Sequence, residues 1–294
     1  MPRQKAFLIL VALVLTWGIN WPIMKVGIAH IPPLWFATIR MLMGAVCLFA
    51  VLLVKGRVRL PDPHDVPIVL SVGLVQMACF MGVTNLALQH VPAGRSAVLA
   101  YTTPLWVTPL AAVLLKERLD ALKLTGVGLG LAGVAALFNP AGFDWRDREV
   151  VLGNGMLMAA AFVWALTIVH VRAHRWRGTP LELAPWEMLI AALPLTVLSY
   201  WHEGPLRLEG SATVVAILVY NGPIATAFAF WAAVTVNKNL PAITASLGFL
   251  GVPVTGAIVA ALALGEPLTP NLLLGLALIL GGVAITTLAG RRPS

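Results

Sequence analysis

The chain has 294 residues, of which 59% are hydrophobic and only 11% are charged. Since soluble domains carry roughly 25% charged residues, this composition excludes an ordinary water-soluble fold and makes lipid the natural solvent. We assign the net charge of +8 to basic loops beside a membrane, and we expect no nucleic-acid partner. Cys47 and Cys79 lie within apolar runs, and we expect both to be small core residues.

Apolar stretches follow one another along the whole chain, each close to the roughly 20 residues that a helix needs to cross the hydrocarbon. The ten stretches cover residues 5–27, 33–54, 66–88, 94–115, 123–139, 151–171, 182–201, 212–236, 241–264 and 270–289. No small-residue cleavage site follows the first stretch, so we interpret it as a span and not as a signal peptide. The pattern therefore predicts an all-α integral membrane protein with ten transmembrane helices.

Lysine and arginine residues are distributed unevenly between the two sets of predicted helix ends. Fourteen of them lie on one side of the membrane and five on the other, with one more inside a span. Because the basic side faces the cytoplasm, this bias predicts that both termini are cytoplasmic. We expect a multi-pass membrane protein with the lipid bilayer as one of its partners.

The second half of the sequence repeats the first. With an offset of 149 residues, segment 92–135 aligns without gaps with segment 241–284, and Pro104 matches Pro253. The earlier part of each half aligns with an offset of 147 residues. Such an ungapped register indicates an internal duplication.

The duplication divides the chain into two units that together form one membrane domain. The first five-helix repeat covers residues 1–140 and the second covers residues 150–290. Because each repeat has an odd number of spans, the second must enter the membrane inverted relative to the first. Many secondary transporters share this inverted arrangement around a central cavity, which can open to either side.

Several motifs resemble a known superfamily. They are Trp17-Gly18-Ile19-Asn20 in the first span, Arg40 in the second, and the block GEPLTPNLLLGLALILGGVA at 265–284. These motifs resemble those of the drug/metabolite transporter superfamily. Within it they are similar to ten-span bacterial exporters with two EamA-type repeats, and more narrowly to YddG-type amino-acid exporters. The resemblance implies a cavity lined by spans 1, 3, 4, 6, 8 and 9, and the export of small metabolites.

Aromatic and amide side chains recur at similar depth in the spans that would line this cavity. The candidate substrate-binding residues are Trp17, Asn20, Gln76, Met77, Phe80, Tyr101, Trp164, Tyr220, Asn221 and Phe228. Aromatic rings suit stacking on a small amphipathic solute, and amides suit an ammonium or a carboxylate. The alternative is that these side chains fill the core and bond neighbouring helices. Trp17 and Asn20 are the strongest candidates because they also belong to the motif.

Prolines inside spans mark candidate hinges. Pro104, Pro223 and Pro253 each remove a backbone hydrogen bond, which is tolerated where the freed carbonyl faces protein or a wet cavity. Simple packing kinks are the alternative. Arg40 lies within the second span, and its repeat counterpart is Glu187. We favour a structural or gating contact for Arg40 over direct binding of substrate.

These features predict a secondary transporter that exports small metabolites, above all aromatic or hydrophobic amino acids, by alternating access. A multidrug, cation or nucleoside exporter of the same fold is the alternative, followed by a channel and by an integral-membrane enzyme. We expect no catalytic residues, cofactor or metal site, and we expect a monomer. No acidic residue lies near the predicted midplane, so the sequence gives little support to a carboxylate proton relay. Protons are still one candidate coupling ion.

Overall fold

The computed structural model describes residues 2–116, 119–138, 145–208, 210–240 and 242–289. The first half contains α1 (Arg3–His30), α2 (Pro33–Val54), α3 (Val66–Leu70), η1 (Ser71–Cys79), α4 (Phe80–Ala87), α5 (Ala93–Ala100), α6 (Thr103–Leu114) and α7 (Ala121–Phe138). The second half contains α8 (Arg148–Ala173), α9 (Pro180–Glu203), α10 (Ala212–Val219), η2 (Tyr220–Phe228), α11 (Ala229–Asn239), α12 (Ala242–Phe249), α13 (Gly251–Leu264) and α14 (Pro270–Ala289). All regular elements of these described ranges are helices, as predicted.

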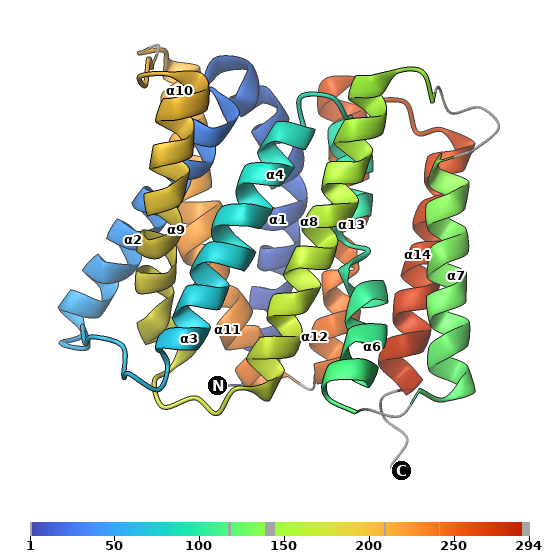
Figure 1. The fold of residues 1–294 in the computed structure, drawn as a ribbon, viewed down its shortest axis with the longest axis horizontal. Helices are drawn as coiled ribbons and strands as arrows, with labels where there is room; N and C mark the ends of the chain where they lie inside the picture. The colour runs from blue at the N-terminus through green and yellow to red at the C-terminus, as the bar shows by residue number, and fades with distance from the viewer. Residues whose placement is uncertain (1, 117–118, 139–144, 209, 241, 290–294) are drawn as a thin grey trace.

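The helices form one bundle in which α1 begins and α14 ends at the same end (Figure 1). We call this end the inner end and the opposite end the outer end, in line with the predicted orientation. Among the described residues, eight helical stretches are long and apolar enough to cross a membrane. The predicted spans at 123–139 and 241–264 correspond to shorter apolar helices, Ala121–Leu137 and Gly251–Leu264. The all-helical membrane class is therefore confirmed.

Two spans change from α-helix to π-helix midway. The span at 66–88 comprises α3, η1 and α4, and the span at 212–236 comprises α10, η2 and α11. Ser71 begins η1, and Tyr220 begins η2, 149 residues later; each π-helix is nine residues long. The two π-helices therefore fall in the register of the sequence repeat. π-Helical turns are rare and occur frequently at functional sites.

Two further spans are interrupted at positions that also correspond in the repeat. α5 and α6 are separated at Tyr101, and α12 and α13 at Leu250, again 149 residues later. Pro104 lies in the first turn of α6 and Pro253 in the first turn of α13. Because a proline has no N–H to donate, the first turn of a helix is where it costs least. These two prolines thus mark helix starts inside a span.

α7 and α14 lie side by side at one edge of the bundle (Figure 1), and their contact is the most extensive among the described helices. A Cβ added to Gly126 would meet the Gly282 carbonyl oxygen at 2.7 Å, and one added to Gly133 would meet the Gly275 oxygen at 2.9 Å. Glycine is needed here because the two backbones approach each other directly. In the sequence repeat Gly126 corresponds to Gly275 and Gly133 to Gly282, so the repeat relates one of these two contacts to the other.

The interpretation of both cysteines as core residues is wrong in one case. Cys47 is half-buried, whereas Cys79 at the end of η1 is exposed, and both are free thiols. The physical reason is that an apolar run in a membrane protein contains lipid-facing as well as core-facing positions. Hydrophobicity alone does not distinguish the two.

Candidate functional site

Predicted site residues from α1 and η2 meet inside the bundle. The indole Nε1 of Trp17 donates a hydrogen bond to the carbonyl oxygen of Ala225 at 3.3 Å. The hydroxyl of Tyr220 donates to the carbonyl oxygen of Thr16 at 2.7 Å. These contacts join the first span of one half to the π-helical span of the other.

Arg40 brings a guanidinium to the same place from α2. Its Nη1 donates to the sulfur of Met24 at 3.2 Å, and its Nε and Nη2 each lie 3.3 Å from the Thr226 hydroxyl oxygen. The residue is only 3% exposed, and no carboxylate of a described residue lies within ion-pair distance of it. A cation buried in a membrane span with only neutral acceptors is energetically costly, which makes Arg40 a candidate functional residue.

Two asparagines are connected to Arg40 through the same acceptors. Asn20 Nδ2 lies 2.9 Å from the Met24 sulfur that also accepts from Arg40. The Thr226 hydroxyl, the other acceptor for Arg40, donates to the backbone oxygen of Asn221 at 2.6 Å. The side-chain oxygens of Asn20 and Asn221 are buried without a hydrogen-bond partner. An unpaired buried acceptor costs about 1–3 kcal/mol and calls for an explanation.

The aromatic candidates are divided between two neighbouring clusters. Phe80 and Trp164 form a T-shaped pair with ring centroids 4.4 Å apart, in a cluster that also includes Met24 and Tyr101. Phe228 lies in a second cluster together with Trp17. Met24 also accepts a hydrogen bond from Arg40, so the cluster with the Phe80–Trp164 pair adjoins the group around Arg40.

Other sequence-predicted residues lie elsewhere or have no contact with this group. Met77 is buried in a separate cluster with Met41 and Met188. Gln76 is half-buried, and among the described contacts it has none with the Arg40 group. Pro223 lies inside η2 itself. The structure therefore brings together Trp17, Asn20, Arg40, Tyr220 and Asn221, with the Phe80–Trp164 pair beside them.

Sequence reasoning missed three residues of the interior. Met24 lies four residues after Asn20, a spacing that places both on one face of α1, which was the available signal. Thr226 bonds the residue five positions earlier, which requires the π-helical turn of η2 and has no sequence signature. Glu187, named from the sequence only as the repeat counterpart of Arg40, is 2% exposed and lies seven residues into α9, about 10 Å from its start.

The outer end of the bundle is closed by a carboxylate clamp between the halves. Glu266, just after α13, accepts from the backbone N–H of Ala93 at 2.6 Å and of Gly94 at 2.9 Å, at the start of α5. α5 and α13 pack closely there, whereas their repeat counterparts at the inner end, α12 and α6, are not among the closely packed pairs of the described elements. The two ends of the bundle are thus packed differently.

Two surface hollows of the described residues lie away from the predicted substrate-binding residues. One of about 440 Å³ lies at the outer end between His30, Leu86 and Glu203, and the other lies beside Trp35 and Trp201. Arg40 and the two asparagines are buried, so this polar group is closed off in the structure. The predicted central cavity stays a prediction.

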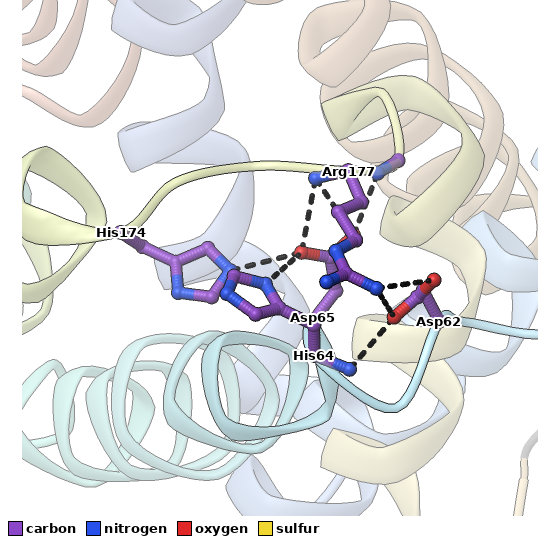
Figure 2. A network of polar contacts seen from close by, with 6 residues as sticks. Asp62, His64, Asp65, His174 and Arg177 are labelled. Atoms are coloured by element: carbon purple, nitrogen blue, oxygen red, sulfur yellow. Dashed lines mark hydrogen bonds and ion pairs between the residues drawn. The ribbon is translucent and has the colours of Figure 1, made fainter.

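Asp65, immediately before α3, joins separate segments at the inner end (Figure 2). The carboxylate is fully buried, and it accepts from His174 Nε2 at 2.9 Å and from the Gly178 N–H at 2.6 Å. Burial opposes its ionisation, but hydrogen bonds from His174, Gly178, Arg177 and His64 outweigh burial and lower the pKa of Asp65 to about 2. Asp65 is therefore a charged anchor at neutral pH.

The EamA-like transporter family model matches residues 4–139 and, separately, residues 151–288. The chain belongs to the EamA-like transporter family. The predicted resemblance to EamA-type proteins is thereby confirmed, and it covers both halves of the chain. Members of this family are named as transporters and efflux pumps and not as enzymes.

Relatives of similar length support this assignment. The uncharacterized transporter YoaV of Bacillus subtilis is 29% identical over 283 residues, covering 96% of this chain and 97% of the relative. A "Probable amino-acid metabolite efflux pump" of Salmonella typhimurium is 29% identical over 302 residues, covering 99% and 97%. A "Probable terminal-alkyne amino-acid exporter" of Streptantibioticus cattleyicolor is 29% identical over 304 residues, with the same coverage.

A solved crystal structure supports the fold. It shares 24% sequence identity with this chain and superimposes with a TM-score of 0.67, covering 99% of this chain and 100% of that chain. This likeness concerns the fold alone. The family match and the apolar helices describe a multi-pass membrane protein of a transporter family.

Proposed function

We propose that this protein exports amino acids and related small amphipathic metabolites across the bacterial inner membrane by alternating access. The observation that carries the substrate class is the buried guanidinium of Arg40, which has no described carboxylate partner. It shares the Met24 sulfur as an acceptor with Asn20, and its other acceptor, Thr226, donates to the backbone oxygen of Asn221; the side-chain oxygens of both asparagines are unpaired. The names of the Salmonella and Streptantibioticus relatives support the same class.

An amino acid supplies the partners that this polar group lacks. Its carboxylate accepts two parallel hydrogen bonds from Arg40, a geometry in which guanidinium pairs are strongest. Its ammonium donates to the free oxygens of Asn20 and Asn221. The side chain of the solute then lies against the aromatic wall of Trp17, Phe80 and Trp164. This proposal revises our expectation that Arg40 has only a structural or gating role.

Alternating access follows from two five-helix halves, residues 1–140 and 150–290, inserted in opposite directions. The repeat-matched π-helices, the repeat-matched helix breaks at Pro104 and Pro253, and the exchangeable glycine pairs of α7 and α14 support this organisation. Glu266 joins α13 to α5 at the outer end, whereas the repeat counterparts of these helices, α6 and α12, are not among the closely packed pairs of the described elements at the inner end. If α6 and α12 packed closely while α5 and α13 separated, the interior would open to the outer end. In this proposal both termini are cytoplasmic, and the protein works as a monomer.

Removing the aromatic or the amide partner of the substrate is expected to impair transport without unfolding the protein. Trp17→Ala and Asn20→Ala should each lower the initial efflux rate about tenfold, because each removes one contact of about 1–1.5 kcal/mol. The rate is measured in proteoliposomes at equal reconstituted protein, with detergent-extracted yield as the folding control. Wild-type flux in both variants would remove these residues from the site.

Weakening the outer clamp is expected to open the outer end. Glu266→Gln replaces one accepting oxygen with an NH₂ group beside the backbone donors of α5, so the outer closure should lose about 1–2 kcal/mol. A cysteine replacing Ala97, which packs against Gly256, reports this opening through a membrane-impermeant maleimide in a background without Cys47 and Cys79. The labelling rate should rise about tenfold. An equal rise for the exposed Glu149→Gln, or no rise for Glu266→Gln, contradicts the clamp.

The substrate class is tested by a panel of labelled solutes in the same vesicles. Amino acids should exit and stabilise the protein in a thermal-shift assay, while amino-acid amides without a carboxylate, nucleosides and cationic drugs should do neither. A cation is disfavoured because it would be placed beside the buried guanidinium. Transport of nucleosides or cationic drugs in place of amino acids would overturn the proposed class.

A further inference from the structure

Three potential metal-ligand atoms converge at the inner end of the bundle, outside the proposed substrate site. His64 Nδ1 and His174 Nε2 lie 3.5 Å and 2.9 Å from the same oxygen, Oδ1 of Asp65, and all three ligand atoms lie within 4.8 Å of one another. Figure 2 shows the two imidazoles approaching this carboxylate from different segments of the chain. Ligands bound at about 2.1 Å to one tetrahedral ion are separated by roughly 3.4 Å, so these spacings suit a shared ion.

We propose that His64, Asp65 and His174 bind a divalent transition-metal ion, with Zn²⁺ as the best match. Two imidazole nitrogens and one carboxylate oxygen form a ligand set that favours Zn²⁺ and similar ions over Mg²⁺ or Ca²⁺, which prefer oxygen ligands. Three protein ligands leave the fourth position of a tetrahedral site to water. The site is therefore exchangeable and not a closed structural centre.

The neighbourhood of Asp65 orients the carboxylate for this role. Its second oxygen, Oδ2, accepts from the backbone N–H of Gly178 at 2.6 Å, and the backbone N–H of Arg177 lies 3.2 Å from both carboxylate oxygens. Hydrogen bonds of this kind fix a ligating carboxylate in orientation, and Oδ1 is the oxygen that lies near both imidazoles. Asp65 has no exposed side-chain surface, unlike the exposed acidic groups that collect on protein surfaces without a metal. His64, at 41% exposure, provides the route of entry from solvent.

The position of the site gives bound metal a structural consequence. Asp65 is the residue before α3, in the first half of the chain, and His174 is the residue after α8, in the second half. The sequence did not predict the site because His174 lies 109 residues after Asp65. A metal ion would link these two segments at the inner end and should therefore stabilise the folded protein.

The test uses tag-free, detergent-solubilised full-length protein that has been stripped with a chelator and titrated with Zn²⁺ and Co²⁺ by calorimetry. We expect one ion per chain, a rise in melting temperature, and Co²⁺ absorption bands of a four- or five-coordinate site. His64→Ala and His174→Ala should each weaken binding by at least about tenfold. His202→Ala removes an exposed histidine near the outer end and should leave binding unchanged.

Two results would overturn the proposal. One is the absence of heat, of a melting shift and of Co²⁺ bands, which would reduce the cluster to a hydrogen-bonded anchor. The other is metal binding that survives both His64→Ala and His174→Ala. His64→Ala keeps the test decisive if His174→Ala fails to fold, because His64 is partly exposed and Asp65 retains its other hydrogen bonds in that variant.

Discussion

Arg40→Gln is expected to lower the efflux of a labelled amino acid from proteoliposomes about 100-fold, because it removes the paired charge-assisted hydrogen bonds to the substrate carboxylate. Initial rates are compared at equal reconstituted protein. The folded protein should not lose stability, since the wild-type guanidinium is buried with only neutral acceptors in the described structure. An unchanged melting temperature with lost transport separates a binding role from a structural one.

Substrates that differ in one group sharpen this test. An analogue that lacks the carboxylate should be a poor substrate of the wild type, and Arg40→Gln should change its flux little. Arg207→Gln, which removes an exposed charge outside the spans, is the matched control and should transport at the wild-type rate. Equal losses for the amino acid and its amide, or full activity of Arg40→Gln, would show that Arg40 does not bind the carboxylate.

Gly282→Ala is expected to give the largest loss of stability among single-methyl changes. The added Cβ would collide with the Gly126 carbonyl oxygen and meet the Gly130 backbone nitrogen at 2.7 Å. Because backbone atoms cannot swing aside as a flexible side chain can, α7 and α14 must separate, which costs about 1–3 kcal/mol. A melting curve in detergent should show the loss as a lower transition temperature.

The control for this prediction lies on the same helix pair. Gly128 of α7 has no atom within 4 Å of an added Cβ, so Gly128→Ala should change stability by less than about 0.5 kcal/mol. Equal melting temperatures for Gly282→Ala and Gly128→Ala would mean that the close approach of α7 and α14 does not stabilise the bundle.

Local sequence signals predicted the all-helical membrane class of the fold. The α2 span at 33–54 matches its predicted bounds, because apolar length and proline position directly encode a membrane helix. The pairing of Pro104 with Pro253 likewise pointed to the two interrupted spans, where the structure has helix starts. Signals of this kind are local, so a single sequence carries them.

The sequence identified only some residues of the candidate site, because the contacts between them depend on longer-range features. Trp17, Asn20 and Asn221 were selected by residue type, but the link from Arg40 through Thr226 requires the π-helical register of η2, which hydrophobic periodicity does not reveal. The tie between Asp65 and His174 joins distant segments and likewise has no local signal. Residue type thus found candidates, and the fold decided which of them meet.

Counterflow in proteoliposomes tests the central claim most directly. Vesicles loaded with unlabelled amino acid are diluted into a trace of the labelled form, and labelled uptake is followed with time. A carrier with two alternating halves predicts transient accumulation of label that requires the unlabelled amino acid inside. Label entry that is indifferent to internal amino acid, or conversion of the amino acid into a product, would contradict the account.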